Sequence, residues 1–149
     1  MLSSILIIVV SAGLLAYWFR YTCLLMLRTD TPRDYAAGIV AANDLKFQEV
    51  QGDLARGVAA EALPELERLL ARDYQLITFL LANAAGFRDG GVTPEQRMLM
   101  LDFYLMRGKY AITRRLAAPL ARTSLQEMAS ILAYFADLMG ARLQVYSET

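Results

Sequence analysis

The side chains most capable of chemistry form an acidic cluster in the middle of the chain. Four carboxylates lie within 13 residues: Glu61, Glu65, Glu67 and Asp73. Paired carboxylates can bind a metal ion or divide the roles of general acid and general base, but helical sites of this kind usually add histidine and a buried pocket. Arg68 and Arg72 are interleaved with the carboxylates. We therefore expect a solvated face of ion pairs.

Histidine is absent from the 149 residues, and cysteine occurs once, at Cys23. The sequence therefore cannot provide an internal disulfide, a Cys/His zinc site, a histidine-bound haem or a histidine-activated nucleophile. We expect no cofactor, no metal and no enzymatic activity. The alternative is an enzyme that uses Asp, Glu, Arg or Tyr in a helical pocket around Asp102, which stands in the apolar run of residues 98–106. If it is structural, a buried Asp102 needs an arginine or an N–H donor.

A basic run in the second half of the chain is the candidate contact site for a partner or for lipid. It holds five cations without an intervening acid: Arg107, Lys109, Arg114, Arg115 and Arg122. Such a run can bind anionic lipid headgroups or an acidic protein. It can equally be an ordinary solvated face, with cations near helix C-termini.

The first part of the chain has the composition of a membrane anchor. Residues 2–19 contain no charged side chain, and apolar residues continue to about Arg28. A lipid environment satisfies the backbone of such a segment only as a helix, so we expect a transmembrane anchor with a juxtamembrane extension over residues 1–28. The residues expected at the membrane interface are aromatic or cationic: Tyr17, Trp18, Arg20, Tyr21 and Arg28.

The charges around this segment predict its processing and orientation. No Lys or Arg precedes it, and its small residues lie in the middle of the apolar run, which favours an uncleaved anchor over a signal peptide. Arg20, Arg28 and Arg33 all follow it, so the positive-inside rule predicts a single-pass protein of the bacterial inner membrane. The N-terminus would lie outside and residues 29–149 in the cytoplasm. A buried helix of a soluble protein is the alternative.

The remaining residues show helical periodicity and no strand pattern. We expect an all-α fold, in which the single N-terminal transmembrane helix is followed by a compact bundle of five or six helices. The expected helices cover residues 32–42, 45–56, 59–87, 93–107, 110–118 and 125–146. Thr93 and Gln96 form a capping box at the start of the fourth. We expect Gly108 to interrupt that helix and Thr123 or Ser124 to cap the last one.

Residues 80–105 read LLANAAGFRDGGVTPEQRMLMLDFYL, a helix, an Asp-Gly turn and a Pro-Glu helix start. This stretch resembles TerB-like helical domains, which also occur behind a single anchor in some membrane co-chaperones. The resemblance implies an all-helical fold. The J-domain of those co-chaperones needs a histidine-proline-aspartate turn, which a chain without histidine lacks, so their activity does not carry over.

These features favour a non-enzymatic accessory or scaffold subunit of a bacterial inner-membrane complex, which binds its partners through the helical cytoplasmic domain. The alternative is a membrane-tethered regulatory or ligand-binding domain. Expected partners are membrane lipid and the proteins of the complex, and a homo-oligomer is also compatible with the sequence. Fifteen acidic residues balance fifteen basic ones, so we expect no binding to nucleic acid.

Overall fold

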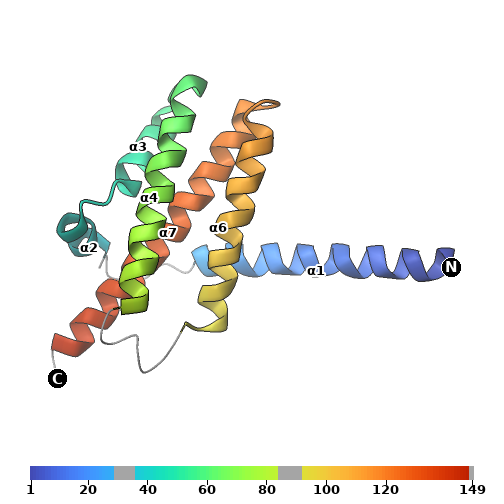
Figure 1. Ribbon diagram of the computed structural model, residues 1–149, viewed down its shortest axis with the longest axis horizontal. Coiled ribbons are helices and arrows are strands. Elements are labelled where there is room, and N and C mark those ends of the chain that lie inside the picture. The colour runs from blue at the N-terminus through green and yellow to red at the C-terminus, as the bar shows by residue number, and fades with distance from the viewer. Residues whose placement is uncertain (29–35, 84–91, 148–149) are drawn as a thin grey trace. The chain divides into compact units, whose positions relative to one another are not determined.

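The computed structural model describes residues 1–28, 36–83 and 92–147 (Figure 1). These residues form six α-helices and one 3₁₀ turn, with no strand among them, which confirms the predicted all-α fold. The chain divides into two units, Met1–Asp30 and Thr31–Thr149. Five of the α-helices belong to the second unit, and they form the predicted bundle.

The first unit consists of the helix α1 (Leu2–Arg28). Its 27 residues include an 18-residue window with a mean hydropathy of 2.1, none of it buried. At about 1.5 Å per residue the helix is about 40 Å long, which exceeds a hydrocarbon core of about 30 Å. Among the described helices, α1 alone is long and apolar enough to cross a membrane. A signal sequence near an N-terminus has the same length and composition.

Two short helices open the second unit. The first, α2 (Ala36–Asn43), covers the described part of the helix expected over residues 32–42, while Arg33 and the expected helix start lie outside the described residues. The second, α3 (Phe47–Arg56), ends at Gly57, whose φ of 78° is left-handed. Glycine is suited to this position because it has no Cβ to clash there.

The helix expected over residues 59–87 is observed as a 3₁₀ turn, η1 (Ala60–Ala62), followed by α4 (Leu63–Asn83). The apolar face of α4 contributes residues with little or no exposed surface to the core, among them Leu66, Leu70 and Ile77. These positions recur at intervals of three and four, as an amphipathic helix requires. The turn expected over residues 88–91 lies outside the described residues.

The structure corrects the predicted chain path after residue 93. The expected break at Gly108 and the expected separate helix over residues 110–118 are wrong, because α6 (Pro94–Thr113) continues through Gly108. A glycine inside a helix lowers its stability by only about 1 kcal/mol, which packing can offset. The capping box at Thr93 and Gln96 is confirmed, since each residue accepts a hydrogen bond from the other's backbone N–H.

The last helix, α7 (Ala118–Ser147), begins earlier than expected. Pro119 lies in its first turn, where the missing N–H costs nothing. Thr123 and Ser124 are therefore not caps. Their hydroxyls donate to the carbonyl groups of Pro119 and Leu120 one turn back, at 3.0 Å each.

Helix α7 is the centre of the second unit, because it contacts α2, α3, α4 and α6 (Figure 1). Its buried face supplies a large share of the core. The fully buried residues on this helix are mostly apolar: Leu125, Met128, Ala129, Ile131, Leu132, Phe135 and Ala136. The surrounding helices are thereby held in place mainly by one shared partner.

Candidate functional site

The five cations of the basic run make different contacts within the second unit. The Nε atom of Arg107 donates to Oε1 of Glu67 on α4 at 2.6 Å. Arg122 turns toward the end of α3, where its Nη2 atom donates to the carbonyl oxygen of Val58 at 2.6 Å. These two arginines are therefore structural links between helices.

The other three cations gather where α6 ends and α7 begins. Arg114 and Arg115 are exposed, and Lys109 is partly exposed one turn earlier. Two backbone hydrogen bonds shape the turn, from the N–H groups of Leu116 and Ala117 to the carbonyl oxygen of Thr113, at 3.0 and 2.8 Å. We call residues 109–120 the α6–α7 corner.

The residues of the acidic cluster also differ in their surroundings, because some form ion pairs at the surface and one is buried. Glu65 lies 3.6 Å from Arg68, an exposed ion pair within α4, and Glu67 pairs with Arg107. Asp73 departs from the expectation of a solvated face, because it has no exposed surface. The charges around Asp73 suggested an exposed residue, but its position one turn from Leu70 and Ile77 places it on the buried face of α4.

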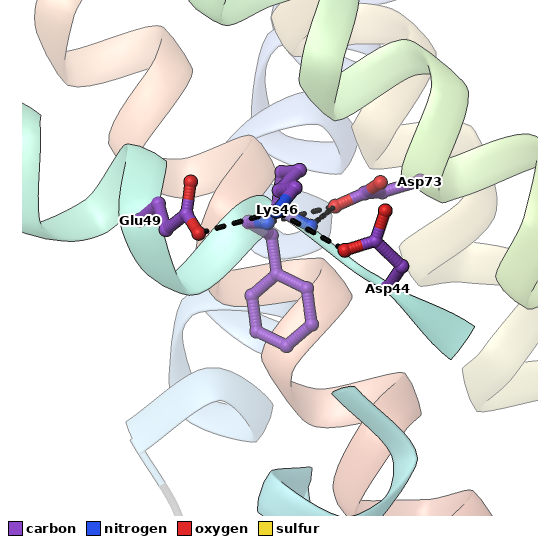
Figure 2. A network of polar contacts seen from close by, with 5 residues as sticks. Asp44, Lys46, Glu49 and Asp73 are labelled. Atoms are coloured by element: carbon purple, nitrogen blue, oxygen red, sulfur yellow. Dashed lines mark hydrogen bonds and ion pairs between the residues drawn. The ribbon is translucent and has the colours of Figure 1, made fainter. Parts of the chain in front are cut away.

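The side chain of Asp73 caps the start of α3 (Figure 2). Its Oδ2 atom accepts hydrogen bonds from the backbone N–H groups of Lys46 and Phe47, at 2.6 and 2.7 Å. No residue near the start of α3 caps this helix with its side chain. Burial raises the pKa of Asp73, partly opposed by these two N–H donors. The carboxyl group thus provides a helix cap from 26 residues away.

The side chain of Lys46 remains at the surface beside this cap (Figure 2). Its Nζ atom lies 3.1 Å from Oδ1 of Asp44 and 3.3 Å from Oε1 of Glu49. Hydrogen bonds to these two carboxylates raise the pKa of Lys46. The turn before α3 requires a left-handed residue, and Asp44 has a φ of 50°. Aspartate tolerates this conformation better than most residues with a side chain.

Asp102 lies on the inner face of α6 and is fully buried. Its neighbour Phe103 belongs to an aromatic cluster that joins α4 to α6. The rings of Tyr74 and Phe103 stack with centroids 4.0 Å apart, and Tyr104 meets Tyr74 edge-on at 5.4 Å. Burial raises the pKa of Tyr74. This cluster is built like a core, since two of its rings are buried.

The opposite side of α6 is also apolar, although it is exposed. Leu101, Leu105 and Ile112 are 53, 47 and 67 % exposed, and their spacing places them on one line along the helix. Tyr104 lies beside this line and is also exposed. We call Leu101, Tyr104 and Leu105 the α6 outer face, whereas Ile112 belongs to the α6–α7 corner. The sequence shows the α6 outer face only indirectly, because residues 98–106 are apolar on every side except at Asp102.

The aromatic residues predicted at the membrane interface are exposed along α1. Tyr17, Trp18 and Tyr21 lie within one and a half turns, and the rings of Tyr17 and Tyr21 stack at 6.5 Å. Arg20 lies among them and Arg28 is the last residue of the helix. Their place at an interface stays a prediction.

No protein-family model matches the chain, and no curated protein or solved structure was found to be similar to it. In the part of the chain that the structure describes, no group of three or more Cys, Asp or Glu residues is arranged to hold a metal ion. The function is therefore argued from the two exposed features of the second unit, the α6 outer face and the α6–α7 corner.

Proposed function

We propose that this protein is a non-enzymatic accessory or scaffold subunit of a bacterial inner-membrane complex, anchored by α1 and bound to its partner through the α6 outer face. The anchor has its N-terminus outside, and the helical domain lies in the cytoplasm, because the arginines follow the apolar segment. The α6 outer face is the observation that carries the proposal.

An exposed row of large apolar side chains is costly in water, and such rows mark interaction sites. The outer face of α4 provides the comparison within the same domain, because Glu65, Arg68 and Gln75 are exposed there and Phe79 is the only large apolar residue of α4 that is exposed. A helix that buries one apolar face and exposes a second one is suited to lie between the domain and a neighbour. Leucine and tyrosine side chains at helical spacing fit the helix-in-groove mode of recognition.

Site-specific crosslinking in intact membranes tests this proposal. A photoreactive residue replaces Leu101 or Leu105 in the full-length protein, and the matched control places it at Gln75 on α4. We expect a crosslink to a second polypeptide from both α6 positions and none from Gln75. Equal labelling from Gln75, or no adduct from α6, would reject the α6 outer face as the binding site.

Substitution of the same residues separates binding from folding. Leu101→Ser with Leu105→Ser should abolish co-purification of the crosslinked partner. The melting temperature should stay close to that of the wild type, because surface changes of this kind alter stability by about 0.5 kcal/mol or less. If the detergent-extracted wild type ran as a lone monomer and captured nothing, the subunit role would be lost.

Reporter fusions test the orientation independently. Joined after Thr149, a reporter that works only in the cytoplasm should be active, and a reporter that works only in the periplasm should be inactive. Activity of a periplasm-dependent reporter at the same position would reverse the predicted topology.

A further inference from the structure

The α6–α7 corner carries the most exposed large apolar side chain of the second unit's described residues. Leu116 is 79 % exposed, and Ile112 and Leu120 on either side of it are 67 and 50 % exposed. All three belong to a stretch of nine residues, so they project from one end of the bundle. Separate apolar side chains on a protruding turn are better suited to insert into the lipid interface than to fill a groove of fixed shape on a protein.

Cations flank these apolar side chains. Lys109, Arg114 and Arg115 lie within the corner, and residues 103–126 contain no carboxylate at all. The corner is therefore basic and apolar together. That combination is typical of a surface that enters the boundary between headgroups and acyl chains of an anionic leaflet.

Neighbouring carboxylates neutralise only part of this charge. Besides burial, which raises the pKa of Tyr110, Arg114 lies close enough to lower that pKa and Glu67 lies close enough to raise it. The corner and the start of α4 lie at the same end of the bundle (Figure 1). Arg122, just after the corner, donates a hydrogen bond to the carbonyl oxygen of Val58, which precedes η1. Glu65 pairs with Arg68 and Glu67 pairs with Arg107. Glu61 adds one exposed negative charge at this end, against the three cations of the corner.

We propose that the α6–α7 corner docks onto the anionic lipid leaflet of the membrane that holds α1. This inference rests on the proposed function only through the anchor. Seven residues separate α1 from α2. Since an extended chain spans at most about 3.5 Å per residue, the tether reaches no more than about 28 Å. Such a tether keeps the domain beside the bilayer, so that weak lipid contacts are sufficient to dock it.

The cations and the apolar tips contribute in different ways. One Lys or Arg at an anionic surface strengthens association about fivefold, so loss of both arginines weakens docking about 25-fold. Reversing both charges weakens it further. Salt screens the cationic contribution, whereas the contribution of Leu116 persists at high ionic strength.

Hydrogen–deuterium exchange of the full-length protein in lipid nanodiscs tests the inference. The discs contain phosphatidylcholine alone or phosphatidylcholine mixed with phosphatidylglycerol. We expect the amides of residues 111–120 to exchange at least about fivefold more slowly in the anionic discs. The amides of α3 serve as the internal reference and should exchange equally in both. The double variant Arg114→Glu with Arg115→Glu should lose the protection, and the matched control Arg72→Glu with Arg97→Glu should keep it.

A second variant distinguishes a loss of docking from a loss of folding. Leu116→Ser removes the most exposed apolar tip without a change of charge, and it should lower the protection while α3 exchange stays as in the wild type. Protection that is equal in the neutral and anionic discs would overturn the proposal.

Two further outcomes have distinct meanings. A chain that stays with the disc while its corner exchanges at the same rate in both lipids would overturn the docking but leave the anchor intact. A chain released from the disc would overturn the anchor, and the docking with it. Protection seen only in native membrane vesicles would assign the corner to a protein and overturn the lipid proposal.

Discussion

Two helices of the domain, α3 and α6, begin in different ways. The start of α6 is capped locally, because Thr93 and Gln96 exchange hydrogen bonds across its first turn. The start of α3 has no local cap, and the backbone N–H groups of Lys46 and Phe47 donate instead to Asp73 on α4. A local cap stabilises its helix even when the helix is isolated. A cap from another helix exists only after the two helices have packed together.

This difference shows that the formation of α3 is coupled to the packing of α4, whereas the start of α6 forms without such coupling. Residues around α6 are sufficient to define its start, whereas α3 depends on the position of α4. The carboxyl group that makes this link is fully buried. Its loss should therefore affect the whole domain, while loss of the local cap should affect one helix end.

The largest effect is expected from Asp73→Ala. It leaves two N–H groups at the start of α3 without their acceptor and should lower the free energy of unfolding by about 3 kcal/mol. Urea unfolding of the full-length protein in detergent, followed by circular dichroism, measures this change. Asp73→Asn is the control, because it keeps an acceptor and should cost only about 1 kcal/mol. Equal losses for the two variants would show that the cap is not the source of the stability.

The opposite end of α3 is defined locally, and Gly57→Ala probes it. The φ of 78° at Gly57 is unfavourable for any residue with a Cβ, although no atom lies within 4 Å of the added Cβ. We expect a loss of about 1 to 2 kcal/mol from backbone strain alone. The same unfolding measurement gives the value, and Gly108→Ala, within the regular helix α6, should instead be neutral or stabilising. Destabilisation by both variants would contradict this account.

A smaller effect is expected from Thr93→Ala at the start of α6. The substitution removes one side of the capping box and should cost about 1 kcal/mol. Hydrogen exchange should reveal faster opening of the first turn of α6 and no change in α3. If amides of α3 opened as well, the start of α6 would be coupled to the rest of the domain as strongly as that of α3.

The smallest effect is a dependence on pH that comes from Asp73. Burial raises the pKa of this carboxyl group above its ordinary value of 3.8, so the folded state holds the proton more tightly than the unfolded state. The stability from this group is fully present below pH 3.8 and is lost as the pH rises through the folded-state pKa. The stability of the wild type relative to Asp73→Asn should therefore fall as the pH rises from 3.8 through the folded-state pKa. A rise over this range would mean that the two N–H donors outweigh burial.

Features that depend on neighbouring residues were predictable from the sequence. The apolar character of α1, the capping box of α6 and the apolar stripe of α4 all follow from spacing within one helix. The burial of Asp102 did not follow from its apolar neighbours, since Leu101 and Leu105 of the same run are exposed.

Features that depend on another helix were not predictable in this way. Asp73 was expected on a solvated face and is buried instead, and its acceptor role depends on the location of α3. Arg122 was grouped with the exposed cations, although it reaches Val58, 64 residues earlier in the chain. Continuation of α6 through Gly108 reflects packing against α7, which outweighs the low helix propensity of glycine.

The central place of α7 has a consequence for biosynthesis. The other α-helices that the structure describes in the second unit all contact α7, yet each of them precedes it in the chain. Translation of the 30 residues of α7 takes about 2 to 6 s at about 5 to 20 residues per second. By then the ribosome has already produced α2, α3, α4 and α6. These helices lack their common packing partner until α7 is complete. The nascent domain thus completes its core only after α1 has emerged from the ribosome, so α1 is accessible to other factors before the domain has folded.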